Sequence, residues 1–258
     1  MPHERIFVVG HQGMLGQVVA KGLGELGHEV VTTGSRFGAQ DDDPLIADVA
    51  NAACSVVVNC AAGLPGRASG ETMWLANALL PIRLASILAP GQMLIHASTD
   101  GVFSGASGPY LVTDLPDAED TYGRTKRVGE AAASSPGVVV IRTSIIGTGA
   151  GILGWLLDQS GDVDGYVNHR WSGVTTLEWT RRCAAIIALG DRHSRIEHLA
   201  SPGVTKYQML VEAARAFDLP VRVRRATAAT SVDRTLIPTI ATGPIGQQLD
   251  ELQRWGTG

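Results

Sequence analysis

The start of the chain carries a glycine-spaced turn between an apolar run and an amphipathic segment, and this feature limits the fold more than any other. Residues 6–9 (IFVV) are an apolar, mostly β-branched run, which is typical of a buried parallel strand. Gly10, Gly13 and Gly16 follow at once. From residue 15 to residue 26 apolar residues recur at three- and four-residue steps, and Gly27 stands where a helix would stop. The segment therefore predicts a strand, a tight turn and a helix.

The same alternation continues through the first 145 residues. Further strands are expected at residues 28–33, 55–59, 92–97 and 138–142, and helices between them at residues 72–88 and 122–133. Strands that alternate with helices predict an α/β, Rossmann-type fold, in which helices cover both faces of a doubly wound parallel sheet. We assign residues 1–145 to this sheet domain.

After residue 145 the pattern loosens. The expected elements are a helix at 152–158, a strand near Tyr166, helices at 177–189 and 204–217, and a strand at 221–225. Residues 146–258 are therefore expected to form a smaller, mainly substrate-binding lobe, with some segments returning to the sheet domain. Because the sequence contains no repeat and no flexible linker, the lobe should pack on the sheet.

Composition excludes several other classes of protein. With 18% charged and 45% hydrophobic residues and a net charge of −4, the 258-residue chain resembles neither a disordered protein nor a nucleic-acid binder. Cys54, Cys60 and Cys183 offer neither a disulfide framework nor a metal-ligand spacing, and no required metal is expected. No secretion signal and no uninterrupted run of about 18 apolar residues occurs. We expect a cytoplasmic globular enzyme without a membrane span, with a homodimer as one candidate assembly.

The glycine turn is a candidate site for a dinucleotide. Backbone N–H groups of such a turn, with the dipole of the helix that follows, can meet a pyrophosphate, although a plain tight turn is the alternative. The expected cofactor contacts from this turn are Gly10, Gln12, Gly13, Met14, Leu15 and Gly16.

The end of the second expected strand bears on which dinucleotide binds. An acidic residue there would hold the adenosine ribose of NAD, but residues 33–36 read TGSR. A guanidinium offers paired donors to phosphate oxygens, so Ser35 and Arg36 favour NADP(H) over NAD(H). A solvated surface arginine is the alternative. Asp48, before Val49, is either a contact to the adenine or a helix cap, and both residues join the cofactor candidates.

Tyr122 and Lys126 stand four residues apart at the start of an expected helix, so they share one face of it. A free tyrosine has a pKa of about 10, and a cation held nearby favours its ionised form. Lys126 would supply this field and bring the phenol closer to acid–base work. The spacing also occurs by chance, as a packing tyrosine and a solvated lysine. Asn77, a lone amide on an apolar helix, should point inward, be hydrogen-bonded, and anchor water or backbone near Lys126.

Ser98, Thr99 and Asp100 follow the fourth expected strand, at the carboxyl edge where ligands of open α/β sheets bind. Hydroxyl groups there can donate hydrogen bonds to a substrate carbonyl, although this tripeptide is also an ordinary turn and cap sequence. Residues 101–120 are rich in glycine, proline and acids, and they are expected to form a loop that borders the substrate cleft.

The chain contains, in this order, VVGHQGMLG, VNCAA, the helical Asn77, STDGVFSG, GPY, YGRTK and VVVIRTSIIG. In order and approximate spacing these segments resemble the extended short-chain dehydrogenase/reductases, specifically the dTDP-4-dehydrorhamnose reductase-like group. The resemblance spans nearly the whole chain. It implies a nucleotide-sugar 4-keto reductase in which hydride passes from the nicotinamide to the C4 carbonyl of the sugar.

The resemblance also implies roles for single residues. Tyr122 would give the proton, Thr99 would hydrogen-bond the substrate oxygen, and Lys126 would hold the nicotinamide ribose. The segment at residues 143–144 matches the entry into the substrate lobe. Further cofactor contacts would come from Cys60, Ala61, Ala62 and Asn77, together with Tyr122 and Lys126.

Departures from the group's pattern leave the substrate open. Gly101 stands where the group often has an aromatic residue, and Ser104 where it often has an aspartate. The run NHRWSGVTTLEW replaces a glycine-proline-threonine turn; its residues 168–171 suit a nucleotide diphosphate, with a cation, a titratable ring and a stacking surface. Lobe packing is the alternative, with Trp171 in the core and Arg170 on the surface. The expected substrate contacts are Ser98, Thr99, Asp100, Arg170 and Trp171.

Two other functions compete with the reductase. A sugar 4,6-dehydratase or 4-epimerase would keep its cofactor through a closed redox cycle, but Gly101 offers no proton where dehydratases of this superfamily carry an acid. Relatives of the group also serve as regulatory subunits of methionine adenosyltransferase, which bind NADP without turning it over. Intact Tyr122 and Lys126 favour an enzyme.

Overall fold

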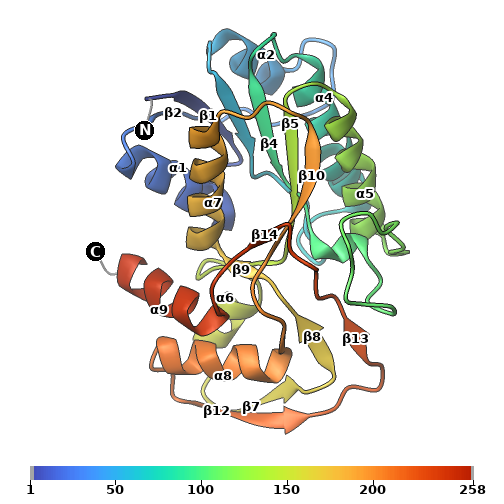
Figure 1. Cartoon of the computed structure of the whole chain (residues 1–258), viewed down its shortest axis with the longest axis vertical. Helices are drawn as coiled ribbons and strands as arrows, with labels where there is room; N and C mark the ends of the chain where they lie inside the picture. The colour runs from blue at the N-terminus through green and yellow to red at the C-terminus, as the bar shows by residue number, and fades with distance from the viewer. Residues whose placement is uncertain (1–2, 257–258) are drawn as a thin grey trace.

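Seven parallel strands form the centre of the molecule, which the computed structural model describes for residues 3–256 (Figure 1). Their order across the sheet is β14, β10, β5, β4, β3, β1, β2. The strands are β1 (Arg5–Val9), β2 (Glu29–Val31), β3 (Val56–Asn59), β4 (Met93–Ala97), β5 (Val138–Arg142), β10 (Arg195–Ala200) and β14 (Ile240–Ala241). The chain moves outward from β1 to β2 and then crosses to β3 on the other side of β1. This is a doubly wound sheet, which confirms the Rossmann-type fold expected from the sequence.

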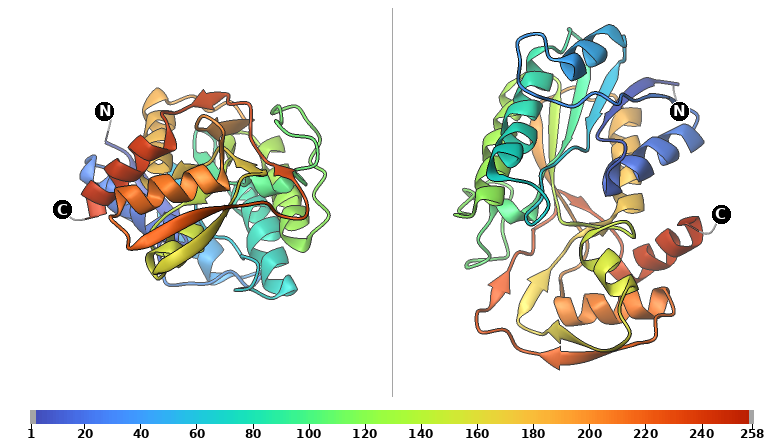
Figure 2. Two further views of the ribbon diagram at one scale, coloured as in Figure 1. Left: turned by 90° about the horizontal axis from the view of Figure 1, so that it is seen from below. Right: turned by 180° about the vertical axis from the view of Figure 1, so that it is seen from behind.

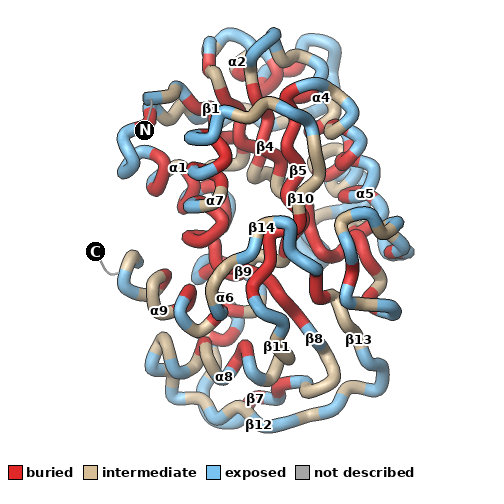
Figure 3. Tube along the Cα trace, in the orientation of Figure 1, coloured by how far each residue is buried: buried red, intermediate tan, exposed pale blue. Residues whose placement is uncertain are grey.

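Helices cover both faces of this sheet, which explains why its central strands are apolar on both sides. One face carries α1 (Met14–Glu25) and α7 (Thr176–Leu189), and the other carries α2 (Pro44–Asn51), α4 (Leu80–Ser86) and α5 (Thr121–Gly129) (Figures 1 and 2). In β1, Ile6 and Val8 join the core under α1 and α7, whereas Phe7 and Val9 join the core under α2 and α4. Figure 3 shows the same central strands as buried.

Several elements differ from the sequence prediction. The helix predicted from residue 204 begins only at Lys206, because Val204 and Thr205 form strand β11. A capping box sets this start: the Thr205 hydroxyl accepts from the Gln208 backbone N–H, and the Gln208 side chain reaches back to Thr205. Four other elements were not predicted from the sequence: α2, β10, β14 and α9 (Ile245–Gly256). In β10 the sequence RIEHLA mixes charged and apolar residues, so no apolar run marks it as a strand.

The helix predicted over residues 72–88 forms as three consecutive segments: α3 (Gly70–Met73), the π-helical η1 (Trp74–Leu79) and α4. Pro81 has no N–H to offer the Asn77 carbonyl four residues earlier, and a wider turn accommodates this loss. The carbonyl faces α5 instead, since a Cβ atom on Gly129 would lie 2.0 Å from the Asn77 oxygen. Only glycine at position 129 allows α5 to come this close to η1.

The lobe lies beyond the carboxyl ends of the strands (Figure 1). Helix α8 (Lys206–Ala216) packs beside α9 and over the paired strands β7 (Gly161–Tyr166) and β12 (Val221–Ala226). Strand β8 (His169–Trp171) lies between β11 (Val204–Thr205) and β13 (Val232–Asp233), while β6 (Ile145–Ile146) pairs with β9 (Val174–Thr175). Helix α6 (Gly151–Leu157) and two 3-10 turns, η2 (Asp100–Val102) and η3 (Glu130–Ser134), complete the described elements. None of the helices within residues 3–256 combines the length and apolar character needed to cross a membrane.

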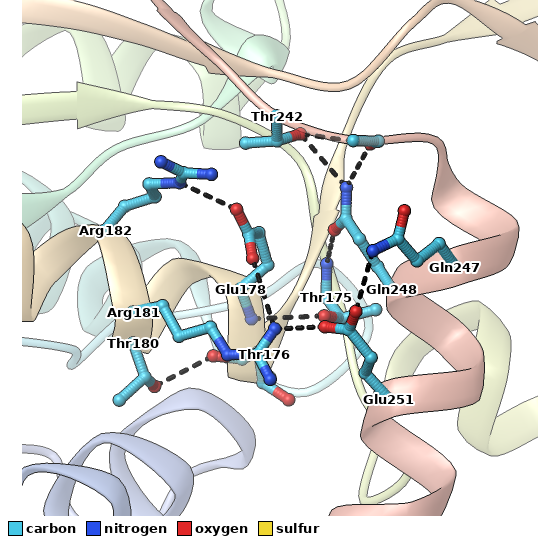
Figure 4. A network of polar contacts seen from close by, with 11 residues as sticks. Thr175, Thr176, Glu178, Thr180, Arg181, Arg182, Thr242, Gln247, Gln248 and Glu251 are labelled. Atoms are coloured by element: carbon cyan, nitrogen blue, oxygen red, sulfur yellow. Dashed lines mark hydrogen bonds and ion pairs between the residues drawn. The ribbon is translucent and has the colours of Figure 1, made fainter.

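A hydrogen-bonded seam fixes α9 to the start of α7 and to the segment after β14 (Figure 4). Gln248 is its centre, with a side chain that is 3% exposed. Its Oε1 accepts from the Thr175 backbone N–H (3.1 Å), and its Nε2 donates to Thr242 Oγ1 (3.0 Å) and to the Gly243 carbonyl (2.8 Å). One side chain of α9 therefore satisfies polar groups from two separate parts of the chain.

Replacing Gln248 tests this seam. Gln248→Ala leaves the buried Thr175 N–H without its acceptor and removes the donor to Thr242 Oγ1 and the Gly243 carbonyl, so the free energy of unfolding should fall by about 2–3 kcal/mol. Urea denaturation measures this loss. The neighbouring Gln247, which is exposed and bonds Glu251, is the matched control. Gln247→Ala should cost less than about 0.5 kcal/mol, and equal losses for the two variants would contradict the seam.

Candidate active site

The glycine turn between β1 and α1 is closely packed and leaves helix N–H groups free for a ligand. A Cβ atom on Gly16 would lie 2.1 Å from the Gly10 carbonyl oxygen, and Gly10 itself has a φ of 79°. Gly13 precedes the first helical residue and places no side-chain oxygen on the N–H groups of α1. The turn therefore fits the pyrophosphate of a dinucleotide, which such N–H groups and the helix dipole bind.

The other cofactor candidates from this segment separate into two groups. Gln12 is exposed on the turn, and Met14 at the start of α1 packs against Gly147, where β6 ends. Leu15 is 7% exposed and belongs to the core under α1 and α7. Only the turn and its first helical residue therefore face away from the core.

At the end of β2, the Asp48 carboxylate binds two hydroxyl groups. Ser35 Oγ donates to it over 2.7 Å, and the Thr33 hydroxyl donates to the same oxygen. These hydrogen bonds lower the pKa of Asp48. The alternative that Asp48 is a helix cap is wrong, because it lies within α2 and Asp43 caps that helix through the N–H groups of residues 45 and 46. Arg36 is exposed next to this cluster.

The remaining cofactor candidates lie around the end of β3. A Cβ atom on Gly10 would lie 2.8 Å from the Ala61 nitrogen, so the segment with Cys60, Ala61 and Ala62 comes close to the glycine turn. Burial raises the pKa of the Cys60 thiol, which therefore stays protonated and unreactive. Val49, by contrast, is 5% exposed and lies in the core under α2.

Tyr122 and Thr99 converge on Gly101 at the carboxyl end of β4. A Cβ atom on Gly101 would lie 3.2 Å from Thr99 Oγ1 and 3.2 Å from Tyr122 Cε1, so both side chains lie against this glycine. Thr99 Oγ1 also accepts from the Gly101 N–H over 3.0 Å. The absent side chain at position 101 allows the phenol and the hydroxyl to meet.

The charge state of Tyr122 differs from the expectation. Burial raises the pKa of its phenol to about 12, against the smaller effect of the Thr99 hydrogen bond. The predicted effect of Lys126 on this pKa finds no support in the structure: its ammonium donates to the Ala97 carbonyl oxygen over 2.6 Å and is not among the groups that shift the phenol. Tyr122 is therefore a protonated phenol at neutral pH, which is the form of a proton donor.

Lys126 is almost fully buried, with 1% of its surface exposed. Burial lowers the pKa of its ammonium to about 8, although the Glu130 carboxylate acts in the opposite direction.

Asn77 on η1 points inward and is hydrogen-bonded, as the sequence predicted, and it contacts α5, the helix that carries Lys126. Its Nδ2 donates to Thr125 Oγ1 (3.1 Å) and the Gly63 carbonyl (2.9 Å), and its Oδ1 accepts from the Gly63 N–H (2.8 Å).

Ser98 binds a buried ion pair, formed by Glu130 and Arg142, that was not predicted from the sequence. The Ser98 hydroxyl donates to Glu130 Oε1 over 2.7 Å, and Arg142 binds both Glu130 oxygens, through Nε at 2.9 Å and Nη2 at 2.8 Å. Arg142 Nη1 also donates to the Val112 carbonyl in the loop 101–120 (3.2 Å). An arginine at the end of a strand and a glutamate at the end of a helix give no sequence signal of this pairing.

Two cations from the lobe lie near Asp100, and neither was among the sequence candidates. Burial raises the pKa of Asp100, while the charges of Lys206 and Arg234 act in the opposite direction. Lys206 is the first residue of α8, and its ammonium lies 5.1 Å from the centre of the Trp171 ring. Arg234 Nη2 donates to the Ser104 carbonyl (3.3 Å), and its enclosed Nε has no partner within the described residues. The capping box that starts α8 was the one available sequence signal for Lys206.

The expected substrate contacts on β8 are not brought together. Trp171 is 2% exposed and belongs to the lobe core, so the prediction of a stacking surface is wrong and the packing alternative holds. Arg170 is exposed and pairs with Asp233 at 3.4 Å. Asn168 binds the backbone of Ala228 through both ends of its amide, at 2.9 Å each. These side chains hold the lobe together.

Burial of the Lys126 ammonium should lower the free energy of unfolding, and this effect can be measured. In the unfolded chain its pKa is near 10.5 and in the folded chain about 8. Between these values the unfolded state binds more protons, so Lys126 destabilises the fold below pH 8, and the penalty disappears as the pH rises toward 10.5. Lys126→Met should therefore raise the free energy of unfolding at pH 7 by about 2 kcal/mol.

Denaturation at several pH values measures this gain. The difference between Lys126→Met and the parent chain should shrink between pH 8 and 10.5. Lys21→Met, at a lysine whose side chain is 50% exposed, is the control. A gain that is absent at pH 7, or that grows above pH 8, would contradict the buried charge.

Comparison with known proteins places this geometry in a family. Residues 4–158 match the family model described as the RmlD substrate binding domain. The chain is 31% identical over 219 residues to the dTDP-4-dehydrorhamnose reductase of Mycobacterium tuberculosis, covering 78% of this chain and 71% of that protein. It is 37% identical over 150 residues to the enzyme of the same name from Mycolicibacterium smegmatis, covering 55% of this chain but only 45% of that protein.

Other similarities are more distant. Methionine adenosyltransferase 2 subunit beta of Danio rerio is 27% identical over 246 residues, or 85% of this chain and 76% of that protein. Two solved dTDP-4-dehydrorhamnose reductases share the fold. The one from Clostridium acetobutylicum has a TM-score of 0.81 and 22% identity over 98% of this chain and 100% of that chain. The one from Bacillus anthracis, solved with NADP, has a TM-score of 0.79 and 15% identity over 97% and 99%.

These matches confirm the resemblance inferred from the sequence motifs. They also confirm the general class that it implied, the NAD(P)-dependent oxidoreductases of nucleotide sugars. The chain belongs to the RmlD substrate-binding-domain family, within the extended short-chain dehydrogenase/reductases.

Proposed function

We propose that the chain is an NADPH-dependent reductase of the 4-keto group of a nucleotide-linked deoxysugar, with Tyr122 as the proton donor. The first candidate substrate is dTDP-4-dehydrorhamnose, because two relatives of the chain are named as reductases of this compound. The observation that carries the proposal is the meeting of Tyr122 and Thr99 over Gly101, at the sheet edge where ligands of such folds bind. The cytoplasmic location and the homodimer stay predictions.

The protonation state of Tyr122 supports its role as a donor. Reduction of a carbonyl consumes one proton, and a phenol with a pKa of about 12 carries that proton at neutral pH. Thr99 Oγ1, which lies against Gly101 as the phenol ring does, would help to hold the same carbonyl oxygen. As negative charge develops on this oxygen, the proton passes to it from Tyr122.

The residues present fit a dinucleotide. The turn of Gly10, Gly13 and Gly16 would hold the pyrophosphate at the N-terminus of α1, and Lys126 would reach the ribose next to the nicotinamide. The bound cofactor would supply the hydride. Arg36 supports NADP(H), because an exposed guanidinium can bind a 2′-phosphate, whereas the Ser35 hydroxyl donates to Asp48 in this structure. A related reductase solved with NADP agrees with this choice, while NAD(H) is the alternative.

Lys206 and Arg234 suit the phosphates of the substrate better than Arg170 and Trp171 do. Both cations come from the lobe and lie near Asp100, the residue next to Thr99. The unpartnered Nε of Arg234 is a donor that a phosphate oxygen would satisfy. We therefore place the nucleotide diphosphate at this junction of the sheet domain and the lobe.

A regulatory subunit is the second candidate function, since one relative is named methionine adenosyltransferase 2 subunit beta. Such a protein would bind NADPH without oxidising it in the presence of a keto sugar. A dehydratase is disfavoured because Gly101 carries no acid.

Tyr122→Phe tests the reductase directly. The change removes only the phenol oxygen, so NADPH oxidation with dTDP-4-dehydrorhamnose should fall by about 100-fold or more. The fall in absorbance of the reduced nicotinamide measures the rate, and fluorescence titration should give an unchanged affinity for NADPH. An active variant would contradict the role of Tyr122. If the parent chain binds NADPH but never oxidises it, the regulatory subunit gains support.

Arg36→Ala tests the choice of cofactor. Loss of the guanidinium should weaken NADPH binding about tenfold or more while NADH binding stays unchanged. Fluorescence titration with each cofactor measures both affinities. Arg83→Ala removes another exposed arginine, on α4, and should change neither. Equal losses for NADPH and NADH in Arg36→Ala would overturn the assignment of the 2′-phosphate site.

A further inference from the structure

Asp48 brings a carboxylate to the end of β2, where the strand itself is followed by no acid. Residues 33–36 read TGSR, but Asp48 lies on α2, and its Oδ2 accepts hydrogen bonds from Ser35 Oγ (2.7 Å) and from the Thr33 hydroxyl. These contacts join residues 13 and 15 positions apart, so the pattern around the strand end gives no sign of them. In a Rossmann-type fold, an acid at this place binds a hydroxyl group of the adenosine ribose.

The Asp48 cluster lies at the same edge of the sheet as the glycine turn. Strands β1 and β2 are neighbours and run parallel, so the residues that follow β2 lie at the edge where the glycine turn follows β1. Helix α2 packs against this part of β1: Val49, next to Asp48, belongs to the same core as Val9, the last residue of β1. The Asp48 carboxylate therefore lies on the side where the adenosine half of a dinucleotide would bind.

The directions of the hydrogen bonds in this cluster suit a hydroxyl group better than a phosphate. The Ser35 backbone N–H donates to Thr33 Oγ1 (3.0 Å), while the hydroxyl groups of both residues donate to Asp48. Both donors of Ser35 are therefore used within the chain. Both bonds to Asp48 reach Oδ2, and no group within residues 3–256 donates to its other oxygen, Oδ1. A ribose hydroxyl can donate to such an oxygen, whereas a phosphate needs donors.

The charge of Asp48 acts in the same sense. The hydrogen bonds from Thr33 and Ser35 lower the pKa of Asp48, so its half-buried carboxylate is ionised at neutral pH. A 2′-phosphate is also negatively charged and would be repelled by it. The exposed Arg36 acts in the opposite sense, because a guanidinium attracts a phosphate. Two residues at one strand end thus favour different cofactors.

We propose that Asp48 is a specificity-determining residue for the cofactor: its carboxylate binds a hydroxyl group of the adenosine ribose and opposes a 2′-phosphate. This inference rests on the proposed function, in that the chain binds a nicotinamide dinucleotide. Arg36 and Asp48 together then allow the chain to bind NADH as well as NADPH, and the balance of their two charges sets the preference. The chemistry at Tyr122 is the same with either cofactor.

Asp48→Asn is the decisive variant, because an amide keeps the size and an acceptor oxygen for Ser35 and Thr33 but removes the charge. The affinity for NADPH should rise about fivefold or more, since the repulsion of the 2′-phosphate is lost. The affinity for NADH should fall about twofold or more, since a neutral oxygen accepts from a hydroxyl group more weakly than a carboxylate does. Fluorescence titration with each reduced cofactor measures both affinities without any substrate.

Asp158→Asn is the matched control. It makes the same chemical change at an exposed acid in the lobe, at the end of α6, and both affinities should stay within about twofold of the parent values. If Asp48 only held residues 33–35 in place, Asp48→Asn would change the affinities for NADPH and NADH by the same factor. That result, or unchanged affinities, would overturn the proposal.

Salt gives a second measurement. The gain of Asp48→Asn over the parent chain in NADPH affinity should shrink between about 0.1 M and about 1 M salt, because salt screens the repulsion that the parent retains. A gain that does not depend on salt would overturn the role of the charge. Failure of the parent chain to bind either cofactor would overturn the proposed function itself. A parent chain that binds NADPH but does not oxidise it would overturn only the reductase, and the titrations would still decide the role of Asp48.

Discussion

A buried ion pair between Glu130 and Arg142 holds together the region in which the proposed chemistry takes place. Its two partners are joined by two short hydrogen bonds, and the Ser98 hydroxyl completes the shell around the carboxylate. Loss of one partner would leave a buried charge uncompensated, which typically costs about 3–5 kcal/mol. The pair therefore constrains three elements at once: the end of β4, the end of β5 and the turn that follows α5.

The same arginine extends the constraint to the lobe. Its guanidinium lies 5.3 Å from the centre of the Phe103 ring, and Phe103 stacks on Tyr110 with ring centres 4.1 Å apart. Tyr110 in turn exchanges backbone hydrogen bonds with Thr235 and Ile237, next to Arg234. The loop 101–120 is thus held from the sheet side and from the lobe side. The relative position of Tyr122 and the lobe cations follows from this continuous set of contacts.

The sequence predicted what depends on local pattern. Two-sided burial makes strands such as β5 continuously apolar, and the close approach of Gly16 to Gly10 requires glycine; both leave a visible signature. Contacts between distant residues leave none. Glu130 and Arg142 are twelve residues apart, and Arg234 reaches Ser104 from 130 residues further along the chain. The sequence left Trp171 open between a stacking surface and lobe packing for the same reason, because an exposed stacking ring and a core ring look alike in sequence.

The pKa of Tyr122 shows why the four-residue spacing from Lys126 was not enough to predict its charge state. A spacing of four residues does place Tyr122 and Lys126 together on α5, but burial acts on each group separately: it raises the pKa of the phenol and lowers that of the ammonium. The lysine ammonium donates to the Ala97 carbonyl, while the phenol ring lies against Gly101 close to Thr99. The tyrosine is thereby kept as an acid by its lack of solvation. An acid held in this way loses its proton only to a group that develops negative charge beside it, as a carbonyl oxygen does when it accepts hydride.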